Sequence, residues 1–179
     1  MAYKTIVVFL LVCTGFVAKA QGPSFEHVGT ITIDLNGQQN MVEADLLVWN
    51  ITGGQIEFKK GGTGQLVQPC GDWADIQDSG TFAMNVRCNL AMDDGSVILF
   101  SYVGKFIFDT YGTEYAASGK VVSPYDGAKY WIATPLMKTQ SEKYSWVNET
   151  IFVAKGVEVL FPAEGVKPYA KYEIYSVVY

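Results

Sequence analysis

The sequence predicts an all-β domain, folded as an antiparallel barrel or sandwich of about nine or ten short strands. Apolar, β-branched segments alternate with turn residues along most of the chain, and no long stretch has helical periodicity. The composition agrees, because 18 glycines suit tight turns while 11 tyrosines, 10 phenylalanines and 4 tryptophans favour strands. A charged fraction of 17% and a hydrophobic fraction of 49% exclude a disordered chain.

Turn residues separate four predicted strands in the first half of the chain. Residues 36–37, 53–54 and 59–62 carry the turn sequences Asn-Gly, Gly-Gly and Lys-Lys-Gly-Gly. Residues 69–73 are expected to form a loop. The four strands are predicted at 25–35, 41–49, 55–58 and 64–68.

Residues 81–92 form the clearest predicted strand, because apolar and polar side chains alternate with period two. Asp93, Asp94 and Gly95 then form a hairpin turn into a strand over 96–103. One face would carry Phe82, Met84, Val86, Cys88 and Leu90, and the other Asn85, Arg87 and Asn89. Further strands are predicted at 105–109, 129–139, 150–159 and 169–178, with a short helical turn at 111–117 or 142–146.

The start of the chain is typical of a secretory signal peptide. Lys4 provides a positive charge, residues 5–18 are apolar, and small residues precede a cleavage site before Gln21. The alternative, a transmembrane anchor, needs a longer apolar run. We therefore expect a leader over 1–20 and a single domain over 21–179, which is secreted and has no membrane attachment after cleavage.

The mature domain is acidic and has a single histidine. The whole chain has a formal net charge of -5, and removal of the leader takes away two lysines and no acidic residue, so the mature charge is -7. A nucleic-acid partner needs a basic surface and is therefore not expected. The predicted partner is a small molecule, with no cofactor, and the sequence carries no signal for an oligomeric state.

Two cysteines, Cys70 and Cys88, remain after cleavage, because Cys13 lies in the leader. An even number of cysteines in a secreted chain predicts one disulfide, and two buried free thiols are the alternative. Asn50 and Asn148 begin N-glycosylation sequons. Asn50 is the better acceptor, because it lies at an expected strand end.

Common catalytic and phosphate-binding motifs are absent from the sequence. A single histidine cannot form a His-rich metal site, and His27 is expected at the surface or edge of the first strand. Asp93 and Asp94 resemble part of a calcium loop, but such a pair more often serves the turn itself. No metal site is therefore predicted.

Asp72 precedes Trp73 in the expected loop and is the candidate general acid or base. A carboxyl group beside a large apolar ring can have a raised pKa because of desolvation. Alternatively, Asp72 caps its own turn while Trp73 fills the barrel end. Arg87 is the second catalytic candidate. It would anchor a carboxylate or enolate if its face lined a cavity, and it would be solvated if that face were the outer one.

Tyr144, Trp146 and Asn148 are spaced by two residues, which would place them on one face of a strand. An aromatic pair followed by an amide suits a ligand pocket with one polar anchor. With Trp73, these three are the predicted ligand-binding residues. Core packing with a satisfied amide is the alternative. Asn148 also cannot easily be both a buried pocket amide and a glycan carrier.

An ordered set of motifs resembles one known family, catalogued as domain of unknown function 3237. The resemblance covers the chain from about residue 53 to the C-terminus and implies a lipocalin-like antiparallel barrel, but no established activity. Cys70 and Cys88 depart together from the family pattern, which favours a bond added in a secreted lineage. The motifs are Gly53-Gly54, Gly71-Asp72-Trp73, Arg87 with Asp93-Asp94-Gly95, Tyr130 with Thr134-Pro135, and Tyr144 through Trp146 and Asn148 to Thr150.

Three functional hypotheses follow. The first is a secreted barrel that binds a small apolar or aromatic molecule in its interior. The second is a cofactor-free isomerase, cyclase or lyase, in which Asp72 is the acid or base and Arg87 or Asn148 stabilises negative charge. The third is a secreted structural or interaction protein with a solidly packed barrel.

Overall fold

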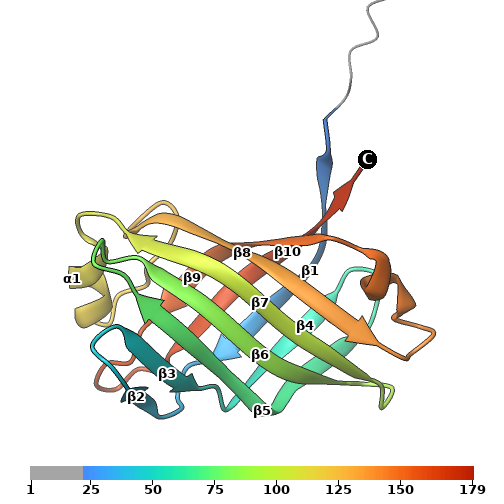
Figure 1. Ribbon diagram of the computed structural model, residues 1–179, viewed down its shortest axis with the longest axis horizontal. Coiled ribbons are helices and arrows are strands. Elements are labelled where there is room, and N and C mark those ends of the chain that lie inside the picture. Colours follow the sequence, from blue (N-terminus) through green and yellow to red (C-terminus); the bar gives the residue numbers. More distant parts are fainter. Residues whose placement is uncertain (1–21) are drawn as a thin grey trace, which may run out of the picture.

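The structure, a computed structural model, describes residues 22–179 and confirms the all-β prediction. The predicted signal peptide and its cleavage site before Gln21 lie outside the described residues. Eight strands form a closed antiparallel barrel, and two further strands extend it at one side (Figure 1). The strands are β1 (Ser24–Asp34), β2 (Gln39–Met41), β3 (Leu46–Asn50), β4 (Gly53–Phe58), β5 (Thr63–Ile76), β6 (Phe82–Met92), β7 (Val97–Phe108), β8 (Ala128–Thr139), β9 (Phe152–Leu160) and β10 (Tyr169–Val178).

The long strand β5 closes the barrel. Its first part pairs with β4 and its second part with β3, while both parts pair with β6 on the other side. The ring therefore runs β5-β4-β1-β10-β9-β8-β7-β6 and returns to β5. This pairing establishes a barrel and excludes the sandwich that the strand pattern alone left open.

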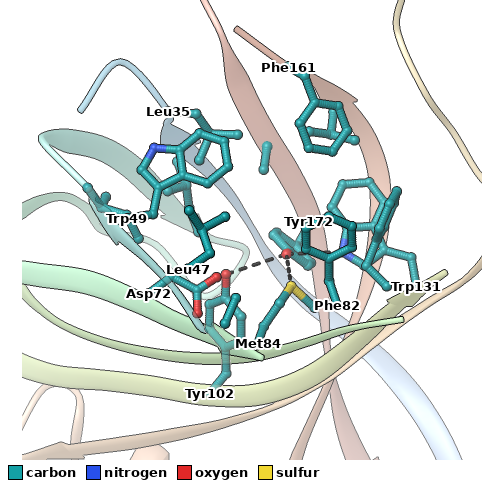
Figure 2. A pocket seen from close by; sticks show the side chains of 16 residues that line it. Leu35, Leu47, Trp49, Asp72, Phe82, Met84, Tyr102, Trp131, Phe161 and Tyr172 are labelled. Carbon is teal, nitrogen blue, oxygen red and sulfur yellow. Dashed lines mark hydrogen bonds between the residues drawn. The ribbon is translucent and has the colours of Figure 1, made fainter. Parts of the chain in front are cut away.

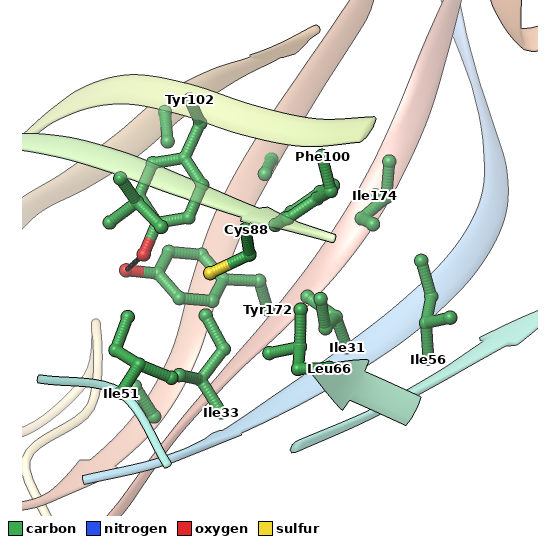
Figure 3. Close-up of a cluster of buried hydrophobic side chains, with 14 of the residues drawn as sticks. Ile31, Ile33, Ile51, Ile56, Leu66, Cys88, Phe100, Tyr102, Tyr172 and Ile174 are labelled. Carbon is green, nitrogen blue, oxygen red and sulfur yellow. Dashed lines mark hydrogen bonds between the residues drawn. The ribbon is translucent and has the colours of Figure 1, made fainter. Parts of the chain in front are cut away.

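The inner faces of the strands form the hydrophobic core. The alternation predicted for β6 is confirmed, since Val86, Cys88 and Leu90 are buried while Arg87 is exposed. Inward side chains from strands on opposite sides of the barrel meet in its centre (Figure 3). They include Ile31, Ile33, Leu66, Phe100 and Ile174.

The expected loop at residues 69–73 is wrong, because these residues belong to β5. Val67 pairs with Asn89 and Gly71 with Arg87, so β5 contains two more residues than β6 over this interval. The extra residues form a bulge, which includes the cis peptide bond before Pro69. Proline and glycine therefore mark an irregularity within a strand here rather than its end.

Two other predicted elements also differ from the structure. The strand expected over 41–49 is divided into β2 and β3 by a turn. Residues Ser145–Glu149 form the 3₁₀-helix η1, which overlaps the helical turn predicted at 142–146, so the single strand face predicted for Tyr144, Trp146 and Asn148 is wrong. The short helix α1 spans Gly112–Ala117, close to the helical turn predicted at 111–117. No helix within residues 22–179 is long and apolar enough to span a membrane.

The two ends of the barrel are built differently. Helix η1 lies at one end and α1 at the other (Figure 1). At the η1 end, Tyr144 is 1% exposed and its hydroxyl donates a hydrogen bond to Asp93 Oδ1 at 3.2 Å. Gly62 allows this close approach, because a Cβ atom there would lie 2.2 Å from the Tyr144 hydroxyl oxygen. Tyr144 thus closes this end of the barrel.

Cys70 and Cys88 form the predicted disulfide, so the alternative of two free thiols is excluded in this structure. The bond joins β5 to β6 beside the bulge in β5. It closes a loop with a sequence separation of 18 residues. Cross-linking a loop of this size restricts the unfolded chain and stabilises a protein by about 3 kcal/mol.

We predict that the double variant Cys70→Ala/Cys88→Ala melts at a lower temperature than the wild type. About 3 kcal/mol corresponds to a decrease in Tm of roughly 6–12 °C for a domain of this size. Differential scanning calorimetry of the purified, oxidised protein, with and without reductant, measures the change in Tm. Reductant should lower the Tm of the wild type and leave that of the variant unchanged. Equal Tm values for the oxidised wild type and the variant would contradict a stabilising bond.

Candidate functional site

A cavity of about 70 Å³ lies inside the barrel on the side away from η1. Its wall is almost entirely apolar and aromatic, and Asp72 is the one charged residue among the sixteen that line it (Figure 2). The lining residues are Ile33, Leu35, Leu47, Trp49, Ile51, Asp72, Ala74, Phe82, Met84, Tyr102, Phe106, Trp131, Val159, Phe161, Ala170 and Tyr172.

Asp72 points into the cavity because of its position in β5. Cys70, Asp72 and Ala74 alternate with outward residues, so all three face inward. The Asp72 carboxyl group accepts a hydrogen bond at Oδ1 from the backbone N–H of Asn85, at 2.8 Å. The partner is on β6, so Asp72 does not cap a turn of its own, as the alternative prediction supposed.

Burial raises the pKa of Asp72 from 3.8 to about 6, and the hydrogen bond from Asn85 partly opposes this change. At neutral pH the carboxyl group is therefore still mostly ionised, but at an energetic cost. None of the residues that line the cavity is a lysine, an arginine or a histidine. The carboxylate consequently has no counter-ion within the cavity wall.

Two tyrosines and a tryptophan form a second polar group in the cavity. Trp131 donates its indole N–H to the Tyr172 hydroxyl at 3.0 Å, and the Tyr102 hydroxyl donates to the same oxygen at 3.4 Å. The Tyr172 hydroxyl in turn lies 3.4 Å from Met84 Sδ (Figure 2). Burial raises the pKa of both tyrosines, and the nearby Asp72 charge raises them further. Both hydroxyls therefore stay neutral at physiological pH.

Aromatic rings enclose this group. Trp131 packs edge-on against Phe106, with ring centroids 5.3 Å apart, and against Tyr172 at 4.9 Å. Gly156 on β9 makes room for the indole, since a Cβ atom at this position would lie 1.8 Å from a Trp131 ring carbon. The glycine is thus required for the position of Trp131, and through it for the hydrogen bond to Tyr172.

Trp49 contributes an unused donor. It is 8% exposed, it lines the cavity from β3, and its register partner on β5 is Asp72. Its indole N–H is the one buried side-chain polar atom without a hydrogen-bond partner among the described residues. Leaving such a donor unpaired is costly, so a water or ligand oxygen at this point would be favourable.

Two predicted site residues lie outside the barrel. Trp73 is 45% exposed and Arg87 is also exposed, and both line a shallow depression on the outer surface of β5 and β6. The period of two places Trp73 opposite to Asp72, and Arg87 opposite to Cys88. Arg87 therefore cannot anchor an anion inside the cavity, and the prediction of a solvated outer face is the correct one.

The other predicted ligand residues lie at the η1 end, away from Asp72. Tyr144 is buried as described above, and the Trp146 ring packs edge-on against Phe58 at 5.4 Å. Asn148 is exposed, and its side chain accepts from the Thr139 N–H at 2.8 Å and donates to the Thr139 carbonyl at 2.9 Å. The three share no strand face, because a tight helical turn carries them.

Asn148 uses its amide nitrogen to hold η1 to the end of β8. A glycan on that nitrogen would have to disrupt this contact. Asn50 lies exposed at the end of β3, as a glycan acceptor should. Its glycosylation remains a prediction.

Asp93 and Asp94 serve the β6–β7 hairpin. Asp94 Oδ1 accepts from the Ser96 N–H at 2.9 Å, and Asp93 Oδ2 accepts from the Thr63 N–H at 3.3 Å. Lys143 lies within 3.6 Å of both carboxylates. Residues 22–179 contain no cluster of three or more His, Cys, Asp or Glu side chains that could hold a metal ion.

Sequence reasoning identified Asp72 but missed the residues that surround it. Trp49, Tyr102, Trp131 and Tyr172 come from four strands that are far apart in the sequence. The alternation within each strand predicts that all four residues face inward. It does not indicate which inward residues meet in a cavity and which fill the core.

Comparisons with known proteins give the same fold. The sequence profile of a family described as "Protein of unknown function (DUF3237)" matches residues 23–177. A β-barrel-like protein from Acinetobacter baumannii AYE is 24% identical with a TM-score of 0.68, over 89% of this chain and 99% of that one. No curated protein matches the sequence.

Two further solved structures are similar. A conserved protein of unknown function from Rhodopseudomonas palustris has a TM-score of 0.75 at 18% identity, over 88% of this chain and 99% of that one. An enzyme from Penicillium herquei has a TM-score of 0.55 at 14% identity, over 89% of this chain and 98% of that one. At these identities the likenesses establish the barrel alone.

We predict that Asp72→Asn is more stable than the wild type at neutral pH. The pKa of Asp72 is about 6 in the folded protein and 3.8 in its ordinary state. Between these values the folded protein binds more protons than the unfolded chain, so the free energy of unfolding falls as pH rises. With about 1.4 kcal/mol per pKa unit, the wild type should lose on the order of 3 kcal/mol between about pH 4 and pH 7 because of this group.

Urea unfolding of both proteins at several pH values measures the difference. The asparagine keeps an oxygen for the Asn85 N–H and cannot ionise, so its stability should lack this decrease. Asp75→Asn is the matched control, because Asp75 is exposed on the outer face of the same strand. Parallel pH profiles for the wild type and Asp72→Asn would refute the raised pKa.

Proposed function

We propose that this chain, which belongs to the DUF3237 family of proteins of unknown function, binds a small, largely apolar or aromatic molecule inside its barrel. The observation that carries the proposal is the cavity around Asp72. Ligand pockets typically combine an apolar, aromatic wall with a few well-placed polar groups. The Asp72 carboxylate and the two tyrosine hydroxyls are such groups in an otherwise apolar wall.

The size of the cavity limits what it can hold. At about 70 Å³ it is smaller than the roughly 150 Å³ apolar cavity that accommodates benzene. Phe82, Met84 and Phe161 line it and are partly accessible to solvent, so the cavity extends toward the barrel surface on this side. A ligand would therefore place a small polar head near Asp72 and its apolar part toward these residues.

Secretion forms part of the proposal. It is supported by the leader-like sequence at residues 1–20 and by the disulfide between Cys70 and Cys88, which is typical of oxidising compartments. An extracellular barrel without cofactor motifs suits capture or transport of a small molecule. The solidly packed barrel of the structural hypothesis agrees less well with an interior cavity that contains a carboxylate.

A second candidate function is proton-transfer catalysis, as in an isomerase, cyclase or lyase. It is favoured by the pKa of about 6 for Asp72, which suits a general acid or base near neutral pH. The Tyr102 and Tyr172 hydroxyls line the same cavity as Asp72. They, and not Arg87 or Asn148, would stabilise the negative charge that forms on a substrate. The Penicillium herquei barrel is an enzyme, so the fold is compatible with catalysis, but a fold does not transmit an activity.

We predict that Ala74→Leu weakens ligand binding in the barrel. Ala74 is 3% exposed and lines the cavity, so a leucine fills the space that a ligand needs. In an NMR titration with toluene, the methyl signals of Ile33 and Ile51 should shift in the wild type, and the affinity of the variant should be at least about tenfold lower. Overpacking costs about 1–3 kcal/mol, so a thermal melt of the variant accompanies the titration.

Trp73→Leu is the matched control, because Trp73 neighbours Ala74 on β5 but faces outward. Its toluene affinity should equal that of the wild type. If toluene, benzyl alcohol, benzylamine and benzoate all leave Ile33 and Ile51 unaffected in the wild type, binding in the barrel is refuted. Equal affinity in a folded Ala74→Leu protein would place the binding site elsewhere.

For the catalytic candidate, we predict that Asp72 catalyses the exchange of acidic carbon-bound protons of a ketone with solvent. Cyclohexanone incubated with the protein in D₂O should incorporate deuterium, measured by mass spectrometry. Asp72→Asn should slow this exchange by about 10²–10⁴-fold, the usual contribution of a general base, with the affinity for the ketone unchanged. Asp75→Asn should match the wild type. Equal exchange by the Asp72 variant would exclude Asp72 as the base.

A further inference from the structure

We infer that the head group of the ligand is a protonated amine, which places its nitrogen against the Asp72 carboxylate and its carbon atoms against the surrounding aromatic rings. This inference rests on the proposed function, because it assumes that the barrel binds a small molecule. Three features of the cavity support it: an uncompensated carboxylate, a wall rich in aromatic rings, and the absence of any basic residue from that wall.

The first feature is the missing counter-ion of Asp72. The ion pairs found among residues 22–179 all lie at the surface, and none involves Asp72. Arg87, the single arginine of the sequence, lies on the neighbouring strand β6 and points outward. A buried charge without a partner is unfavourable, and the opposite charge restores the balance when it arrives with good geometry. A ligand cation would supply the partner that the protein lacks.

The second feature is the set of aromatic rings in the wall of the same cavity. Cations are attracted to the faces of aromatic rings, and tryptophan is the most effective. Cages of aromatic residues recognise methylated and other organic ammonium groups for this reason. The Asp72 side chain shares the cavity with seven rings (Figure 2). They belong to Trp49, Phe82, Tyr102, Phe106, Trp131, Phe161 and Tyr172.

The third feature is the chemistry that the cavity disfavours. A carboxylate or phosphate ligand would meet the Asp72 charge with no basic residue in the wall to offset it. The formal net charge of the whole chain, -5, also favours the approach of cations over that of anions. A neutral alcohol can donate a hydrogen bond to Asp72, so it is the competing ligand class that the experiment must separate.

The groups facing Asp72 keep the expected pH response simple. The titratable side chains near it are Tyr102 on β7 and Tyr172 on β10. On β3 and β6, the residues paired with Asp72 are Trp49 and Val86, which do not titrate. Both tyrosines stay neutral below pH 8, because burial raises the pKa of each. Between pH 5 and pH 7.5, Asp72 is thus the group in the cavity that changes charge.

The test compares benzylamine, benzyl alcohol and benzoate, which share a ring and differ in the charge of the head group. Binding is followed at pH 7.5 by the methyl signals of Ile33 and Ile51, which line the cavity. We expect benzylamine to bind at least about tenfold more tightly than benzyl alcohol, and benzoate to bind most weakly. Lowering the pH to 5 should weaken benzylamine binding and leave benzyl alcohol binding unchanged.

Asp72→Asn should remove the preference, so that benzylamine binds no more tightly than benzyl alcohol. Asp75→Asn, on the outer face of the same strand, should retain it. Equal binding of the amine and the alcohol by the wild type, an unchanged preference in Asp72→Asn, or tightest binding of benzoate would each overturn the inference and leave the barrel as a binding site. No response to any of the three compounds or to toluene would overturn the proposed function as well. The wild-type pH series keeps the inference testable if the Asp72 variant fails to fold.

Discussion

The seam between β5 and β6 determines both the closure of the barrel and the direction in which the cavity-lining side chains of β5 point. Strand β5 gains two residues relative to β6 at the bulge between Val67 and Gly71. Because the side-chain period of a strand is two, an even insertion preserves the alternation, whereas a single extra residue would reverse it. Leu66 before the bulge and Asp72 after it therefore both face inward. The disulfide between Cys70 and Cys88 ties the bulge to β6 at this point.

The same seam explains why a carboxyl group is found inside an apolar barrel. Reversal of the alternation would place Asp72 in solvent and Trp73 in the interior, which hydrophobicity alone would favour. The structure has the opposite arrangement, with Trp73 45% exposed and Asp72 in the cavity. Natural proteins accept such local conflicts mainly where function requires them. The conflict at residues 72 and 73 is therefore an argument for function that does not depend on any resemblance to other proteins.

Patterns within one strand were predictable from the sequence, and contacts between strands were not. The alternation over residues 82–92 placed Arg87 and Cys88 on opposite faces, as the structure confirms. The same two-residue spacing wrongly predicted a strand face for Tyr144 and Trp146. Such spacing also occurs in a 3₁₀-helix, and here the hydrogen bond between Asn148 and Thr139 on β8 holds the helical turn in place. Proline usually marks the end of a strand, so Pro69 predicted a loop. A strand accepts a proline when its partner strand tolerates a bulge, and the sequence of one strand does not show this. Asp72 was found through its neighbour Trp73, although that ring lies on the other side of the sheet.

The η1 end of the barrel and the cavity differ in how their polar groups are satisfied. At the η1 end, Tyr144 is buried against Gly62, and Asn148 fixes the helical turn to β8 through two hydrogen bonds. These contacts satisfy the local polar groups at that end. At the cavity, the Asp72 carboxylate has no counter-ion, and the indole N–H of the lining residue Trp49 is buried without a partner. Unsatisfied groups destabilise an empty site and make occupation favourable, because the ligand then recovers the cost of their burial. The polar groups that identify the site are thus also the ones that would select its ligand.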